Sequence, residues 1–194
     1  MEKILKDQRR DLPCNFETRA DGEDLYIEGY FAVFNSEYQI FDDAVETIKQ
    51  GAFSETLDRD IRALIDHETR LVLGRTSAGT LELKEDDHGL WGRIKINPND
   101  GDAMNLYERV KRGDVNQCSF GFDILEEDFQ DLGGGKAMWI IEKVRLYEVS
   151  VVTFPAYTDT AVTARKDELA ERSKRKAQLW RERAIAKLKG EKNA

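Results

Sequence analysis

The strictest constraint on the fold is an alternation of apolar and polar residues from Gln117 to Ile124. A strand with this period places its apolar side chains on one face, namely those of Cys118, Phe120, Phe122 and Ile124. Ser119 and Gly121 fall on the opposite face. Glycine inside a strand often marks a close approach by a ligand or by another backbone segment. A hydroxyl beside bare backbone is what a nucleophile site needs, but the stretch by itself favours an ordinary strand with one polar face.

Short apolar segments separated by turn residues recur along the chain. Alternation and β-branched content predict strands at 14–20, 25–34, 61–65, 71–73, 80–84, 90–96 and 138–153. Residues 44–57 are expected to be irregular chain that leads into a short helix. The pattern predicts a mainly β protein with peripheral helices, of the α+β class, built as a β-barrel or a β-sandwich.

One helix is expected between the strands. It begins after Pro98, with Asn99 or Asp100 as its cap, and continues to about Lys111, where Gly113 ends it. Such a helix is expected to pack outside the β-structure.

Three segments differ in composition. Residues 1–13 are polar and predict a flexible N-terminal arm, residues 14–163 the folded domain, and residues 164–194 a charged helix of about 24 residues. Residues 165–194 contain 11 Lys/Arg and 5 Asp/Glu, which is a net charge of +6. Because the whole chain has a net charge of −8, residues 1–164 carry −14. The acidic body argues against nucleic-acid binding by the main domain. The basic end is expected to be a solvated helix face or a contact for an acidic partner or nucleic acid.

The sequence does not indicate a membrane-spanning, secreted, disulfide-rich or metal-binding protein. No apolar run reaches the roughly 18 residues of a membrane span, and the N-terminus lacks the apolar centre of a secretory signal. Cys14 and Cys118 lie far apart and form no disulfide framework, so a reducing compartment is expected. Two histidines and no cysteine pair at ligand spacing predict no metal site, and no cofactor is expected.

Three residues are candidates for catalysis: His67, Ser119 and Glu148. A serine needs a base that accepts its proton, and the imidazole needs an acceptor that fixes its tautomer. Each residue also has an ordinary interpretation: His67 as a surface histidine between two acids, and Glu148 as a carboxylate on a solvated strand face. His88, in an acidic hairpin turn, is the weaker base candidate, and Cys118 is expected in the core.

The order of these residues resembles a known family. Asp66-His67, Leu73-Gly74-Arg75, Cys118-Ser119-Phe120-Gly121-Phe122 and the segment from Glu148 to Ala156, EVSVVTFPA, are similar to the prohead maturation protease family of HK97-like tailed bacteriophages. The resemblance covers residues 14–163. It implies a closed or nearly closed β-barrel of the type found in herpesvirus assemblin proteases. In those relatives the third catalytic residue is a second histidine, whereas Glu148 occupies that position here.

The resemblance also implies a function. Ser119 is expected as nucleophile, His67 as general base and then acid, and Glu148 as the orienting group, with backbone amides between Phe154 and Thr158 as oxyanion donors. The chain is expected to be a serine endopeptidase of a phage or prophage. Inside the procapsid, in the bacterial host cytoplasm, it would cleave the scaffold, or the scaffolding segment of the major capsid protein, and itself. The implied partners are these substrates and a second copy in a homodimer, with no membrane and no specific nucleic acid.

Two alternatives remain open from the residues. The first is a non-enzymatic β-barrel scaffold or capsid-binding module that keeps the fold without the chemistry; the presence of both Ser119 and His67 argues against it. The second is a protease fused to a scaffold domain through its C-terminal helix. In the serine endopeptidase interpretation, by contrast, the basic helix of residues 164–194 is expected to be either a docking segment or a tail removed by self-cleavage.

Overall fold

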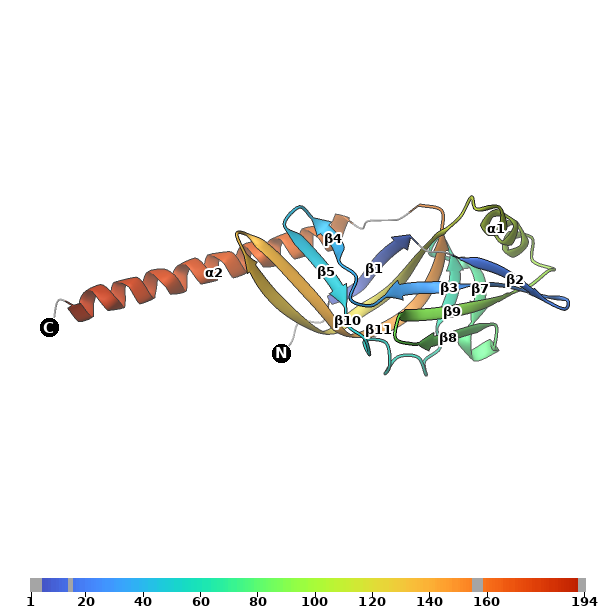
Figure 1. The fold of residues 1–194 in the computed structure, drawn as a ribbon, viewed down its shortest axis with the longest axis horizontal. Helices are drawn as coiled ribbons and strands as arrows, with labels where there is room; N and C mark the ends of the chain where they lie inside the picture. The colour runs from blue at the N-terminus through green and yellow to red at the C-terminus, as the bar shows by residue number, and fades with distance from the viewer. Residues whose placement is uncertain (1–4, 14–15, 155–158, 192–194) are drawn as a thin grey trace. The chain divides into compact units, whose positions relative to one another are not determined.

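The structure is a computed structural model that describes residues 5–13, 16–154 and 159–191 (Figure 1). The chain divides into two compact units, Met1–Tyr157 and Thr158–Ala194, a boundary six residues before the predicted one. In chain order the elements are β1 (Leu5–Pro13), β2 (Glu17–Asp21), β3 (Asp24–Val33), β4 (Tyr38–Phe41), β5 (Ala44–Ile48), β6 (Arg62–Ile65), β7 (Glu68–Arg75), η1 (Thr76–Ala78), β8 (Leu81–Glu85), β9 (Gly89–Ile96), α1 (Gly101–Arg112), β10 (Gln117–Gly133), β11 (Lys136–Val152) and α2 (Asp159–Glu191).

Strand β11 is the centre of the larger sheet. Along one side it pairs antiparallel with β10. Along the other it pairs parallel with β5 near its start and with β6 near its end. The described strand order is β1-β10-β11-β5-β4, with β7 attached through β6. Two long strands therefore hold together segments that are far apart in the sequence.

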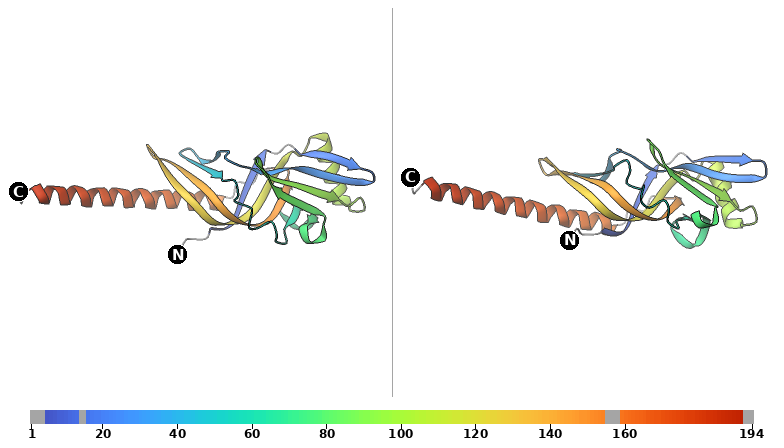
Figure 2. Two further views of the ribbon diagram at one scale, coloured as in Figure 1. Left: turned by 60° about the horizontal axis from the view of Figure 1, so that its bottom comes forward. Right: turned by 90° about the horizontal axis from the view of Figure 1, so that it is seen from below.

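The β10–β11 hairpin turns at a run of three glycines. Gly133, Gly134 and Gly135 all have positive φ, at 80°, 63° and 90°. Only glycine adopts such values in succession without steric cost, so the run permits a tight reversal. Figure 2 shows the two strands as a long, bent pair.

The smaller sheet has the order β2-β3-β9-β8. The predicted hairpin of two alternating strands is confirmed as β8 and β9. Strand β3 pairs with β2 on one side and with β9 on the other, so it is a central strand of this sheet.

The apolar face of β10 is part of the core. Phe120 and Phe122 are fully buried and their rings stack with centroids 4.8 Å apart, while Phe53 meets Phe120 edge to face at 5.7 Å. Burying each such side chain contributes about 1.5–3 kcal/mol, so this face fixes the strand firmly. Cys118 is buried on the same face, as predicted.

Helix α1 follows the sequence prediction closely. The Asp100 carboxylate accepts hydrogen bonds from the backbone N–H groups of Asp102 and Ala103, and Gly113 closes the helix in the left-handed conformation. The buried residues form one apolar stripe along the helix: Ala103, Leu106, Tyr107 and Val110. This stripe contacts β2, β3 and β9, so the helix covers the smaller sheet.

Three predictions of local structure were wrong. The polar segment expected as a flexible arm forms β1, because its backbone groups pair with the open edge of β10. Residues 44–48, expected to be irregular, form β5 because β4 and β11 flank them and satisfy their hydrogen bonds. The short helix expected before Leu57 is a series of turns.

The mainly β, α+β class is confirmed, whereas a closed barrel is not. In the described strands, neither sheet returns to its first strand. The larger sheet is nevertheless strongly curved. The evidence is a hydrogen bond in which Arg10 Nη2 on β1 donates to Glu46 Oε2 on β5 at 2.8 Å. In sheet order β10 and β11 lie between these strands, so only a curved sheet brings the two side chains together.

The second unit contains α2, which spans 33 residues and so exceeds the predicted helix. Ion pairs within it include Glu168 with Arg172 at 2.8 Å, four residues apart. Several large apolar side chains along it are exposed, and Trp180 is 70% exposed. In the part of the chain that is described, no helix is long and apolar enough to cross a membrane.

Candidate active site

His67 lies in the tight turn between β6 and β7. Asp66 and His67 both have positive φ, at 47° and 61°, which non-glycine residues rarely adopt. The Asp66 carboxylate accepts from the backbone N–H of Thr153 at 2.7 Å and from its hydroxyl at 3.2 Å. The backbone N–H of Asp66 donates to Val151 at 3.0 Å. These contacts hold the turn, and with it the imidazole, against the end of β11.

His67 contacts Glu148 directly. Its Nδ1 lies 2.7 Å from Glu148 Oε1, and the two side chains are 7% and 14% exposed. The contact follows from the parallel pairing of β6 with β11, which places Arg62 opposite Glu148 and Ile65 opposite Val151. The two residues are 81 positions apart in sequence, so only this pairing brings them together.

Ser119 lies on the neighbouring strand, on the same face of the sheet. In the β10–β11 register Ser119 is opposite Ser150, and Gly121 is opposite Glu148. Directly opposed residues have Cβ atoms about 5 Å apart and share a face. Ser119 is fully buried, and its Oγ has no hydrogen-bond partner among the residues described. A buried hydroxyl without a partner is uncommon in folded proteins and is a reason to consider a chemical role.

Ser150 completes the cluster and was missed by the sequence analysis. Its Oγ donates to Glu148 Oε2 at 2.6 Å and lies 3.4 Å from His67 Nδ1. The signal was present in the sequence, because residues two apart on a strand share a face and Glu148 and Ser150 have that spacing.

This geometry determines which nitrogen of His67 is basic. A proton on Nδ1 that is donated to the carboxylate leaves the lone pair on Nε2, and this nitrogen can accept a proton from a hydroxyl. The carboxylate also stabilises the imidazolium that forms on proton transfer. The arrangement could therefore serve as a base and an orienting acid, beside a strand that carries a buried hydroxyl.

A second buried acid lies further along the same face of β10. Burial raises the pKa of Asp123, but hydrogen bonds from Tyr147 and Arg145 outweigh burial, and the pKa falls below its ordinary value. Arg145 Nη2 approaches Asp123 Oδ2 at 2.6 Å. Asp123 is therefore an ionised structural carboxylate, and Glu148 is the acid that contacts the imidazole.

The remaining candidates lie elsewhere. His88 is exposed in the β8–β9 turn, where its ring packs on Tyr30 with centroids 4.5 Å apart. The Cys118 thiol faces the core and donates to the Tyr30 carbonyl at 3.4 Å. Cys14 and the expected oxyanion segment at 155–158 lie outside the described residues. Over the ranges that are described, no group of three or more His, Cys, Asp or Glu side chains is arranged to hold a metal ion.

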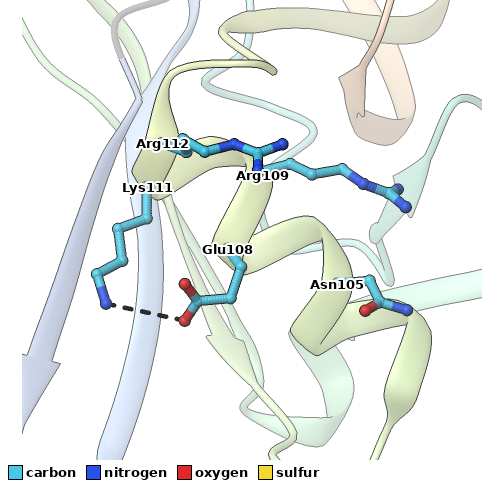
Figure 3. Close-up of a pocket in the computed structure, with 5 residues that line it drawn as sticks. All are labelled: Asn105, Glu108, Arg109, Lys111 and Arg112. Carbon is cyan, nitrogen blue, oxygen red and sulfur yellow. Dashed lines mark ion pairs between the residues drawn. The ribbon is translucent and has the colours of Figure 1, made fainter.

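A hollow on α1 is separate from this cluster. It is lined by Asn105, Glu108, Arg109, Lys111 and Arg112, none of which was a predicted site residue (Figure 3). Lys111 pairs with Glu108 at 3.8 Å and Arg112 pairs with Asp114. These cations lie in the last turn of the helix, where they complement its dipole, so the hollow needs no ligand to explain it.

Comparison with known proteins decides the family. Residues 14–175 match the family described as caudovirus prohead serine protease. The chain belongs to that family. The match confirms the resemblance found in the sequence and assigns the chain to a family of serine peptidases.

Two known proteins are similar to the chain. The chain is 31% identical to the prohead protease of Enterobacteria phage HK97 over 150 residues, which are 75% of this chain and 62% of the relative's length. The chain thus spans less than two thirds of that relative. A solved structure, the capsid assembly protease of bacteriophage T4, matches with a TM-score of 0.46 and 12% identity, covering 79% of this chain and 98% of the other.

Proposed function

We propose that this chain is a serine endopeptidase of phage head maturation, with Ser119 as nucleophile, His67 as general base and Glu148 as orienting acid. One observation carries the assignment of roles. The 2.7 Å contact between His67 Nδ1 and Glu148 Oε1 lies on the face of the sheet that also carries the buried Ser119 hydroxyl. Membership of the family supports the chemistry, and this geometry supports the residues.

The reaction is acyl transfer. Ser119 Oγ attacks the carbonyl carbon of the substrate as His67 Nε2 accepts its proton, and a tetrahedral oxyanion forms. The imidazolium returns the proton to the leaving amine, which departs and leaves an acyl-serine. Water, deprotonated by His67, then attacks the ester, and proton return to Ser119 releases the acid. Glu148 holds the tautomer and balances the charge of the imidazolium in both halves.

The oxyanion needs fixed N–H donors. Backbone amides in the segment from Phe154 to Thr158 remain the proposal for this role. The segment directly follows the Thr153 contact that holds the His67 turn, so it starts beside the base.

Membership of the family supports a proposal for the substrates and the location. We propose that the chain cleaves the scaffold, or the scaffolding segment of the major capsid protein, and itself, inside the procapsid in the host cytoplasm. A homodimer is proposed for the active form. The curved larger sheet, with its Arg10–Glu46 pair, supports a nearly closed barrel of the assemblin type.

The test is co-expression with the capsid precursor of the same phage. The wild-type chain is expected to shorten the precursor and to react covalently with a fluorophosphonate. Ser119→Ala is expected to abolish both while the circular dichroism spectrum is unchanged. Ser173→Ala, at an exposed position on α2, is the matched control and retains both activities.

Undiminished processing by the Ser119→Ala variant would remove Ser119 from the mechanism. A wild-type chain that binds the precursor but neither cleaves it nor reacts with the probe would favour the non-enzymatic capsid-binding module.

A further inference from the structure

We infer that Ser150 is a positioning residue that fixes the Glu148 carboxylate for its contact with His67. The inference rests on the proposed function and extends it from three residues to four. It starts from the two oxygens of one carboxylate. Oε1 meets His67 Nδ1 at 2.7 Å, and Oε2 accepts the Ser150 hydroxyl at 2.6 Å.

A carboxylate held at one oxygen can still rotate about its terminal torsion, which has a broad energy profile. Holding the second oxygen removes that freedom and sets the plane of the group. Because Glu148 is mostly shielded from solvent, losing the Ser150 donor leaves Oε2 with an unmet hydrogen-bonding requirement. The carboxylate then turns toward another donor, and its contact with the imidazole weakens.

Ser150 is itself well placed for this role. It is fully buried in the centre of the larger sheet, with Ser119 opposite on β10 and Leu64 opposite on β6. Its hydroxyl lies 3.4 Å from His67 Nδ1, at the side of the nitrogen that already meets Glu148. The Ser150 hydroxyl therefore lies near the ring nitrogen that contacts Glu148, and not near Nε2, which is the nitrogen that accepts the proton. For this reason Ser150 acts through Glu148.

The pair Ser150→Thr and Ser150→Val tests the role, since the two side chains have nearly the same volume and only Thr carries a hydroxyl. The Val variant is expected to lower kcat about 10- to 100-fold and to leave KM within about twofold of wild type. Losses of this size are typical when a group that orients a functional side chain is removed, as around metal-binding residues. Thr is expected to recover most of the loss. In a Glu148→Gln background, the Val substitution should cost less than threefold, because the two residues act as one unit.

A second readout does not depend on peptidase activity. The chain has two histidines, so a spectrum of ¹⁵N-histidine-labelled protein contains two rings, and His88→Gln assigns them. The Nδ1–H signal of His67 is expected to persist in wild type and Ser150→Thr and to broaden or disappear in Ser150→Val. This holds even if the chain cleaves no peptide, so failure of the proposed function and failure of this inference are distinguishable.

Three results would overturn the inference. Equal kcat in the Thr and Val variants would mean that the hydroxyl has no role. Full additivity with Glu148→Gln would mean that Ser150 acts only on packing. Loss of fluorophosphonate labelling in folded Ser150→Val, with labelling retained in Ser119→Ala, would make Ser150 the nucleophile.

Discussion

Gly121 and Glu148 are opposed across β10 and β11, and the carboxylate occupies the space where a side chain at position 121 would lie. A Cβ added at Gly121 would be 2.5 Å from Glu148 Oε1 and 3.2 Å from its Cδ. The strand pattern predicted that a ligand or another backbone segment would approach Gly121, and the group that approaches is instead the Glu148 side chain. The absence of a side chain at position 121 is therefore part of the geometry of the site.

Gly121→Ala should lower the peptidase rate much more than it lowers stability. The added methyl group meets the end of a flexible side chain, so the fold can adapt by moving the carboxylate, and the contact with His67 is lost. A displacement of about 1 Å in a catalytic group can cost on the order of 100-fold. The measurement is kcat beside the melting temperature. Gly101→Ala is the matched control, since nothing lies within 4 Å of its added Cβ. Equal rates in the two variants would refute the prediction.

Glu148→Gln should reduce the rate less than His67→Ala does. An amide can still accept from Nδ1–H, although it no longer balances the imidazolium, whereas alanine removes the base. In serine protease triads the corresponding losses are on the order of 10⁴-fold and 10⁶-fold. Single-turnover cleavage of a peptide substrate measures both. An equal or larger loss in the glutamine variant would show that these roles are ranked wrongly.

Asp123→Asn should destabilise the protein at neutral pH and much less in acid. The pKa of Asp123 lies below its ordinary value, so its stabilising contribution is present above about pH 4 and is lost as the pH falls through the lowered value. Replacing an acceptor that pairs with Arg145 and Tyr147 should cost about 1–3 kcal/mol at pH 7. Urea unfolding of both proteins at pH 7 and pH 3 measures the difference. A gap that does not narrow in acid would contradict the assignment.

Tyr38→Phe should protect the fold at high pH. Burial, the largest cause, raises the pKa of Tyr38 from 10.0 to about 12. A group with a raised pKa contributes stability that is complete below the unfolded value and is lost as the pH rises through the folded value. Wild type should therefore lose stability between about pH 10 and 12 relative to the variant. At neutral pH the variant is the weaker, because the hydroxyl donates to the Val33 carbonyl at 2.7 Å. The measurement is the free energy of unfolding of wild type and variant across this pH range. Curves that stay parallel up to about pH 12 would contradict the prediction.

Trp180→Ser should leave peptide hydrolysis unchanged and reduce incorporation into procapsids. The side chain is 70% exposed on α2, so its removal costs the folded chain little. An exposed aromatic residue on a basic helix is suited to a protein contact. Western blotting of purified procapsids measures incorporation, and a soluble peptidase assay provides the comparison. If hydrolysis falls and incorporation does not, α2 is not a docking helix.

Local sequence determined the features that depend on local physics. Alternation from Gln117 to Ile124 predicted both faces of β10, because a strand repeats every two residues. The cap at Asp100 and the stop at Gly113 predicted α1, because helix ends are satisfied by nearby groups. The residues that carry the family resemblance also identified His67, Ser119 and Glu148 as candidates before any geometry was known.

Tertiary structure decided which of these residues meet. The His67–Glu148 contact depends on β6 pairing parallel with β11, and the role proposed for Ser150 depends on its distance to both partners. The same cause explains the wrong predictions: residues 5–13 and 44–48 become strands because neighbouring strands satisfy their backbone groups. Strand pairing between distant segments leaves no periodic signal in either segment. The sequence therefore predicted the strands that show alternation, whereas the fold decided the other strands and which side chains meet.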